Sequence, residues 1–242
     1  MRAACLIARK ELGSFFDSPM AYLVIVAFLG TSGFFTWWFG TDIFMRGIAD
    51  LSTFFQVANW SLFILIPAIS MRTLAEERKT GTLDLLLTRA VSPQQVVNGK
   101  FLACTALIFL TLLCTLPYYI TVARLGPVDH GPVVCGYAGL MLMGAAYLAL
   151  GIFASSLTSN QISAFILALV LMAVFHFGTS VLAANTTGTL GQLFQYLSTG
   201  RHFESLGRGV VDSRDLVYFL SLTAAGLLLA GRQLARSGAK PA

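Results

Sequence analysis

Charged side chains are scarce in this sequence. Asp, Glu, Lys and Arg together make up 11% of the 242 residues, whereas hydrophobic residues make up 56%. A soluble domain carries roughly 25% charged residues, so this chain has too few charges to cover a water-soluble globule of its size. The mean hydropathy of +0.76 agrees with this. The composition excludes a cytosolic, secreted or disordered protein and predicts an all-α, polytopic membrane protein.

Metal-binding, disulfide and nucleotide-binding patterns are missing as well. The four cysteines form no CxxC motif and no Cys/His spacing typical of zinc, and HExxH is absent. The nucleotide-binding pattern GxxxxGK[ST] does not occur, because Asn98-Gly99-Lys100-Phe101 lacks the first glycine and the final Ser or Thr. We therefore expect this chain to bind no metal and no cofactor, and to hydrolyse no ATP. The net charge of +5 is typical of basic loops beside a membrane, not of nucleic-acid binding.

Six apolar runs reach or approach the length that crosses a bilayer. A helix rises about 1.5 Å per residue, so roughly 20 apolar residues cross a core of about 30 Å. The predicted spans are Pro19–Phe39, Phe54–Met71, Phe101–Ala123, Val133–Ala154, Ile162–Leu182 and Leu216–Gly231. We expect Pro67 to break the second span and Asp212 to cap the N-terminus of the sixth. The first run is longer than the apolar region of a signal peptide, and no small-x-small cleavage site follows it, so we interpret it as a retained span.

Lys and Arg are distributed unevenly between the two sides of this topology. The side that holds both termini carries eleven of them, namely Arg2, Arg9, Lys10, Arg72, Arg78, Lys79, Arg89, Lys100, Arg232, Arg236 and Lys240. The opposite side carries five, namely Arg46, Arg124, Arg201, Arg208 and Arg214. Basic residues accumulate on the cytoplasmic side of membrane proteins. The distribution predicts that both termini are cytoplasmic.

Residues 1–18 are predicted to form an amphipathic helix that lies on the inner leaflet. Arg2, Arg9 and Asp17 fall away from its apolar side, and Pro19 marks the turn into the bilayer. The apolar stripe consists of Cys5, Ala8, Leu12, Phe15 and Phe16. A frayed, solvated tail is the alternative.

The longest predicted cytoplasmic loop, residues 72–100, contains signals for ordered structure. Thr73–Lys79 can form one or two helical turns, with Gly81 as their stop. Ser92 and Gln95 form a capping box that begins a helix leading into the third span. Between these helices lies an apolar cluster that must pack on the spans or on a partner, namely Leu83, Leu85, Leu86 and Leu87. A solvated loop of mixed charge is the alternative.

The order of motifs in this loop resembles the permease subunits of the type-2 class of ABC transporters, which are six-span exporters. In that class a coupling helix follows the second span, marked by EE-x-x-x-GT, then by LL and by a proline-led helix that ends in GK. This sequence supplies Glu76-Glu77-Arg78-Lys79-Thr80-Gly81-Thr82, then Leu85-Leu86-Leu87, Ser92-Pro93 and Gly99-Lys100. Residues 8–19 and 201–219 resemble the gliding-motility branch of these permeases, so the resemblance covers nearly the whole chain.

The resemblance implies a role and a set of partners. Residues 1–242 would form a single transmembrane permease domain in the bacterial cytoplasmic (inner) membrane. Its coupling helix, residues 76–82, would contact a dimer of ABC ATPase subunits, which would bind ATP and Mg. A second permease copy, identical or different, would complete the transporter, and Gly30, Gly33, Gly139, Gly144 and Gly151 would permit close helix approach. The resemblance supplies no substrate and no direction of transport.

Two further segments are candidate contact sites. Ser155–Gln161, between the fourth and fifth spans, is either a second ATPase contact through Ser156, Thr158 and Asn160 or a simple tight turn. The external loop, residues 183–215, has an apolar helical stripe that either lies at the outer leaflet or covers the spans. Its stripe comprises Leu190, Leu193, Phe194 and Leu197, and its candidate contacts to an extracytoplasmic auxiliary protein are Arg201, His202, Glu204 and Asp212.

Other functions receive less support from the sequence. Glu76-Glu77 resembles the EE-x-x-x-R signature of prenyl-protein proteases, but Gly81 stands at the arginine position, so we expect no enzyme. His176 in the fifth span is either a functional ionisable group or a neutral side chain bonded to a neighbouring helix. The spans contain almost no other ionisable group, which argues against an ion-coupled secondary transporter. A permease-like subunit that transmits force or a signal without transport remains the main alternative.

Overall fold

The structure is a computed structural model that describes residues 2–38, 47–82 and 92–238, with helices and no strand in these ranges. Within them, six helical segments are long and apolar enough to cross a membrane, which confirms the predicted fold class. They are α2 (Met20–Trp37), α4 (Ser52–Ser70), α7 (Pro93–Leu113) with α8 (Leu116–Leu125), α9 (His130–Leu157), α10 (Gln161–Ala173) with η1 (Val174–Gly178) and α11 (Thr179–Asn185), and α14 (Ser213–Gly238). The predicted leucine cluster at 83–87 lies outside the described residues, as do Arg46, Arg89 and Lys240.

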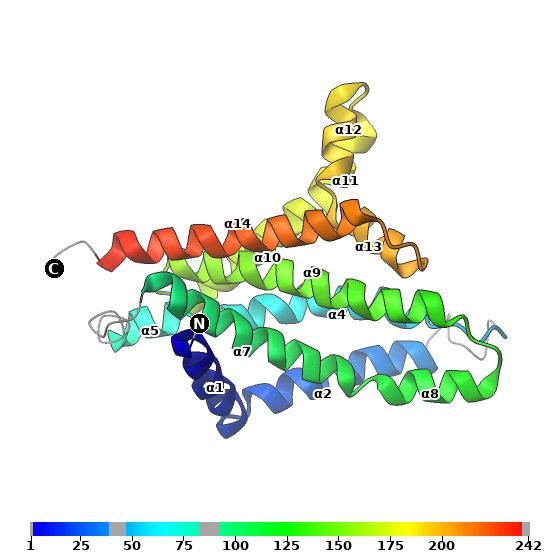
Figure 1. Ribbon diagram of the computed structural model, residues 1–242, viewed down its shortest axis with the longest axis horizontal. Helices are drawn as coiled ribbons and strands as arrows, with labels where there is room; N and C mark the ends of the chain where they lie inside the picture. The colour runs from blue at the N-terminus through cyan, green and yellow to red at the C-terminus, as the bar shows by residue number, and fades with distance from the viewer. Residues whose placement is uncertain (1, 39–46, 83–91, 239–242) are drawn as a thin grey trace.

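Four further features complete the bundle (Figure 1). At one end, named the α5 end, lie α1 (Arg2–Asp17), α5 (Ala75–Thr80) and the last turns of α14. At the other, the α13 end, lies α13 (Thr199–Gly207), beside the start of α14. The predicted external helix is α12 (Thr189–Tyr196); with α11 it projects sideways from the bundle, and Leu190, Leu193 and Leu197 are exposed on it.

The centre of the bundle is α9. Of its most apolar window, 72% is buried inside the protein, against 56% or less for the other spans. Glycines let its neighbours approach closely: a Cβ at Gly136 would lie 2.5 Å from the Phe55 ring, and one at Gly151 2.2 Å from Ser70 Oγ. Among the glycines predicted to permit close approach, Gly139 and Gly151 therefore pack within one subunit, whereas a Cβ at Gly30 would meet nothing within 4 Å.

The prediction that Pro67 breaks the second span is wrong, because α4 runs through it to Ser70. Proline lacks the N–H that would bond the preceding turn, but membrane helices tolerate this where neighbouring groups bond the freed backbone. The carbonyl that the ring frees is that of Phe63, four residues earlier, whereas the Pro67 carbonyl keeps its helical bond from Met71 N at 2.9 Å and accepts a second from the Ser70 hydroxyl at 3.3 Å, so the helix continues past the proline. The interruption occurs instead in the third span, between Leu113 and Leu116, next to Pro117.

The N-terminal helix packs mainly on α7, and its contact face differs from the predicted stripe. Ala4 is buried, and the closest approach is at Gly99, where a Cβ would lie 2.7 Å from Ile7 Cγ2. Cys5, expected on the apolar stripe, is exposed instead. The predicted stripe assumed that α1 packs on the membrane surface. In the structure α1 packs on α7, where Gly99 leaves room for Ile7, so the shape of α7 determines which face of α1 points inward.

A larger side chain at position 99 should separate α1 from the bundle. We expect Gly99→Val to destabilise the protein by about 1–3 kcal/mol, because overpacking forces the Ile7 side chain and the Ala4 carbonyl away. Faster tryptic cleavage at Arg9 and Lys10 of the purified protein reports the separation. Gly13→Val is the matched control, since a Cβ there meets nothing within 4 Å; equal cleavage of both variants would contradict the tight packing.

Candidate functional site

The short helix α5 is held by the end of α9. Ser155 is fully buried there, and its Oγ accepts hydrogen bonds from the backbone N–H groups of Leu74 (3.1 Å) and Ala75 (3.0 Å). The same hydroxyl donates to the Met71 carbonyl at 3.2 Å. Since the first N–H groups of a helix have no partner within it, a side chain some eighty residues away caps the N-terminus of α5.

The C-terminal end of α5 is set by Gly81. Its φ of +72° is left-handed, a conformation that glycine adopts without strain, and its N–H reaches the Arg78 carbonyl. The predicted helix stop is therefore confirmed. Thr80 also turns its hydroxyl back to the Glu76 carbonyl at 3.0 Å, which closes this end of the helix.

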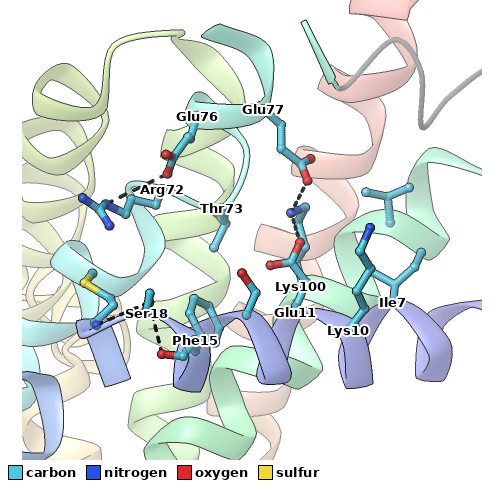
Figure 2. A pocket seen from close by; sticks show the side chains of 13 residues that line it. Ile7, Lys10, Glu11, Phe15, Ser18, Arg72, Thr73, Glu76, Glu77 and Lys100 are labelled. Carbon is cyan, nitrogen blue, oxygen red and sulfur yellow. Dashed lines mark hydrogen bonds and ion pairs between the residues drawn. The ribbon is translucent and has the colours of Figure 1, made fainter. Parts of the chain in front are cut away.

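A buried ammonium joins α5 to α7 and α1 (Figure 2). Lys100 is 3% exposed, and its Nζ lies 2.8 Å from Glu77 Oε1 and in direct contact with Glu11 Oε1. One positive charge therefore faces two carboxylates, and the network carries a net charge of −1. Charges taken out of water are tolerated only with such close partners. The network ties three elements that are distant in the sequence.

Glu77 corrects one part of the sequence prediction. The predicted coupling helix, residues 76–82, would present Glu77 to the ATPase, but the Glu77 side chain is only 19% exposed and points to Lys100. Successive residues of a helix lie 100° apart around its axis, so two adjacent glutamates cannot face the same way. The exposed residues of the segment are Glu76, Lys79, Thr80, Gly81 and Thr82, with Arg78 half-buried.

A cavity of about 410 Å³ adjoins this network. It lies between α1, the end of α4, α5 and α7. Charges of both signs line it, namely Lys10, Arg72 and Lys100 with Glu11, Glu76 and Glu77. Arg72 Nε is 4.0 Å from Glu76 Oε2. Glu77 Oε2 is buried and has no hydrogen-bond partner within the described ranges. The arrangement can receive a hydrogen-bond donor or a cation.

Comparison with known families decides the class of this chain. The sequence model of the family described as ABC-2 family transporter protein matches residues 46–206. That range covers well over half of the chain. The chain belongs to the ABC-2 transporter family. It is thus a multi-pass transmembrane subunit of an ABC transporter. A comparison with curated proteins found no match.

The family match covers the whole of α5, including Glu76–Thr82, but not α1. The resemblance to the gliding-motility branch rests on residues 8–19 and 201–219, most of which lie outside 46–206, so that branch stays a prediction.

The second predicted contact of the ABC-2 chain, Ser155–Gln161, comprises the end of α9, a short connection at residues 158–160 and the start of α10. Ser156 is buried and donates to the Phe153 carbonyl of its own helix at 2.6 Å, so the expectation that its side chain is presented at the surface is wrong. Asn160 Oδ1 accepts from Ile162 N and caps α10, while Thr158 Oγ1 accepts from Asn160 N. The functional group that sequence reasoning missed is the neighbouring Ser155, because its partners lie in a distant segment.

Residues proposed as external contacts divide into two kinds. Arg201 and Glu204 are exposed on α13. His202 is buried, because its Nδ1 lies 2.6 Å from Asp215 Oδ1, its Nε2 lies 2.9 Å from the Tyr196 carbonyl, and its ring stacks on Tyr218. His202, a predicted site residue of the external loop, is therefore buried within the fold. Asp212 accepts from Arg214 N at 2.9 Å, which confirms it as the N-cap of α14.

His176 lies in the π-helical turn η1, buried among aromatic rings. Its Nδ1 is 2.5 Å from the Tyr147 hydroxyl of α9, so the side chain is bonded to a neighbouring helix, one of its two predicted roles. No group of three His, Cys, Asp or Glu side chains that could hold a metal ion occurs in the part of the chain covered by the structure.

Removing the central ammonium should weaken the α5 end of this ABC-2 subunit. We expect Lys100→Met to destabilise it by about 2–4 kcal/mol, because two neighbouring carboxylates lose their shared cation; their partial exposure keeps the loss below that of a fully buried pair. Thermal unfolding in detergent measures the change, with the exposed Lys79→Met as control. Adding Glu77→Gln to Lys100→Met should restore part of the loss, and strictly additive effects would contradict a shared network.

Proposed function

We propose that this chain couples ATP hydrolysis by a partner ATPase to movement of a substrate across or out of a bacterial cytoplasmic membrane. Its α5 end faces the cytoplasm and contacts a dimer of ABC ATPase subunits, which bind ATP and Mg. Two permease copies form the transport path between them. The observation that carries this proposal is the attachment of α5, through Ser155 and Lys100, to three other helices, α9, α7 and α1.

Force on α5 has two routes into the bundle. The first runs through the Ser155 hydroxyl into α9, the central span, because any displacement of Leu74 or Ala75 stretches bonds to a buried group. The second runs through Glu77 and Lys100 into α7 and, through Glu11, into α1. Packed elements linked in this way move together as rigid bodies rather than deforming.

The surface offered to the ATPase is the outer face of α5. Glu76 and Lys79 are its exposed charges, followed by Thr80 and Thr82. The Glu76 side chain is 48% exposed and loosely paired with Arg72, so a basic group on the ATPase can compete for it. An exposed charge at such a rim adds little affinity by itself, whereas a charge of the wrong sign placed opposite a basic group of the partner opposes association strongly.

Orientation in the membrane can be tested directly. In a background without the native cysteines, we expect Lys79→Cys to react with an impermeant maleimide from the cytoplasmic side and Thr187→Cys from the opposite side. Both positions are exposed, so accessibility depends on topology and not on burial. Labelling of both positions from the same side, or with the sides exchanged, would overturn the orientation.

Coupling can be tested by reversing the exposed charge alone. We expect Glu76→Lys to reduce copurification of the ATPase from native membranes by about tenfold, without changing the thermal stability of the permease, because the pair with Arg72 is largely solvated. Glu204→Lys, which disturbs the similar i,i+4 pair with Arg208 at the α13 end, is the matched control. Equal ATPase recovery with both variants would show that Glu76 is a solvated charge and not a contact.

The copurified permease preparations also distinguish the alternative functions from the proposed one. Absence of any ATPase that carries GxxxxGK[ST] would favour a secondary transporter. A bound ATPase whose activity no substrate stimulates would favour a subunit that transmits force or a signal. An extracytoplasmic auxiliary protein, bound at the exposed Arg201 and Glu204 of α13, would copurify in either ABC arrangement.

A further inference from the structure

A second cavity, of about 520 Å³, lies at the α13 end within a single copy of the chain. Its walls come from the first half of α4, from η1 and α11, and from the start of α13. The volume falls in the range of small-molecule sites, about 300–1,000 Å³. The side chains that matter below are Asn59, Trp60, Ser198 and Arg201.

Two polar atoms in this wall lack a protein partner. Ser198 is 1% exposed, and its Oγ is buried without a hydrogen bond within the ranges that the structure describes. The same holds for Asn59 Oδ1, across the cavity on α4. Buried polar groups are nearly always hydrogen-bonded, since leaving them unpaired is unfavourable. Ser198 and Asn59 both line this cavity, so a polar ligand bound there is the group best placed to pair with their unpartnered oxygen atoms.

The rim of the cavity carries positive charge. Arg208 is 3.8 Å from Glu204, so these two rim charges compensate each other. Arg201 is exposed and has no carboxylate partner among the residues that are described. One guanidinium therefore remains to meet an anionic group, which it can bind through paired N–H donors.

One part of the cavity wall is aromatic. Trp60 lines the cavity and stacks on Phe177, with ring centroids 5.1 Å apart and planes 26° apart. Its neighbour His176 belongs to the π-helical turn η1, and Thr199 at the start of α13 donates to the Phe175 carbonyl of that turn at 3.2 Å. Single π-turns often occur at functional sites. This wall suits the apolar part of a molecule whose charged head lies at Arg201.

We propose that this cavity binds an amphipathic anion, with its acidic head at Arg201, hydrogen bonds to Ser198 and Asn59, and its apolar part against Trp60. The inference rests on the proposed function in one respect, because it names the class of molecule that the transporter moves. Binding itself requires no ATPase. The acidic head can belong to a membrane lipid or to a free amphiphile, which share this chemistry.

The test measures binding through Trp60. The variant carrying Trp37→Phe and Trp38→Phe keeps Trp60 as its sole tryptophan and is placed in phosphatidylcholine nanodiscs. Titration with 12-bromododecyl phosphate should quench Trp60 saturably, whereas 12-bromododecyl trimethylammonium, of opposite charge, should bind at least about tenfold more weakly. Equal quenching by both probes would overturn the proposal, because Trp60 would then report only amphiphile dissolved in the bilayer.

Matched variants locate the site. In the same background, Arg201→Gln should weaken binding of the anionic probe about tenfold, while Arg124→Gln, an exposed arginine on α8 away from the cavity, should leave it unchanged. Ser198→Ala should weaken binding without lowering the thermal stability, because its hydroxyl bonds no protein group. Wild-type binding by both Arg201→Gln and Ser198→Ala would assign the cavity to water alone and refute the proposal.

Two further measurements distinguish a lipid from a free amphiphile and separate the anion site from the proposed coupling. If a lipid is the natural occupant, phosphatidylglycerol in the nanodisc should compete with the probe, and Arg201→Gln should abolish that competition; if a free amphiphile is the occupant, anionic lipid should have no effect. Either result supports an anion site. Saturable binding in a permease that recovers no ATPase would refute the proposed coupling and leave this site standing. ATPase recovery without saturable binding of the probe would refute this site and leave the proposed coupling standing.

Discussion

The α5 end of this protein depends on one ammonium group, that of Lys100, placed between the carboxylates of Glu77 and Glu11. A lysine that is 3% exposed at the edge of a membrane span has no stable alternative to such partners. Because the two glutamates come from α5 and α1, the need to solvate this charge draws both helices onto α7. The geometry of the cavity beside them follows from that constraint.

A second constraint acts through a single hydroxyl. The Ser155 hydroxyl accepts from two backbone N–H groups at the start of α5 and donates to the Met71 carbonyl before it. A short helix that would be unstable alone is thereby fixed to the end of α9. Together with Lys100, this makes α5 part of the rigid bundle. A helix so attached is suited to receive force from outside the membrane, which is what a coupling element requires.

The two ends of the bundle differ in how their polar groups are satisfied. At the α5 end the charges pair mainly with one another. At the α13 end His202 is saturated by Asp215 and Tyr196, whereas Ser198 and Asn59 line a cavity without protein partners. Polar groups whose hydrogen bonds are all made within the protein stabilise the fold. Polar groups beside a cavity that lack a protein partner indicate where a ligand can supply the missing hydrogen bond. The contrast underlies the two proposals, of a partner-binding surface at the α5 end and of a ligand-binding cavity at the α13 end.

The sequence by itself determined the features that depend on local chemistry. Apolar run length determined the six spans, and capping chemistry determined the helix start at Ser92, the stop at Gly81 and the cap at Asp212. The order of motifs after the second span was sufficient to indicate the family that the match over 46–206 shows. The path of α4 through Pro67 was not predicted, because neighbouring groups and not the proline decide it.

Only the tertiary structure decided which polar groups meet. Glu76 and Glu77 are adjacent in the sequence, yet one faces solvent and the other Lys100, because the partner of Glu77 lies on a different helix. Ser155 and Ser156 are equally adjacent, and only the first reaches α5. The pairing of side chains from distant segments depends on how the helices pack, and packing follows from shape complementarity at positions such as Gly99 and Gly151. The periodicity of apolar residues in the sequence does not show which helix surfaces are complementary in shape.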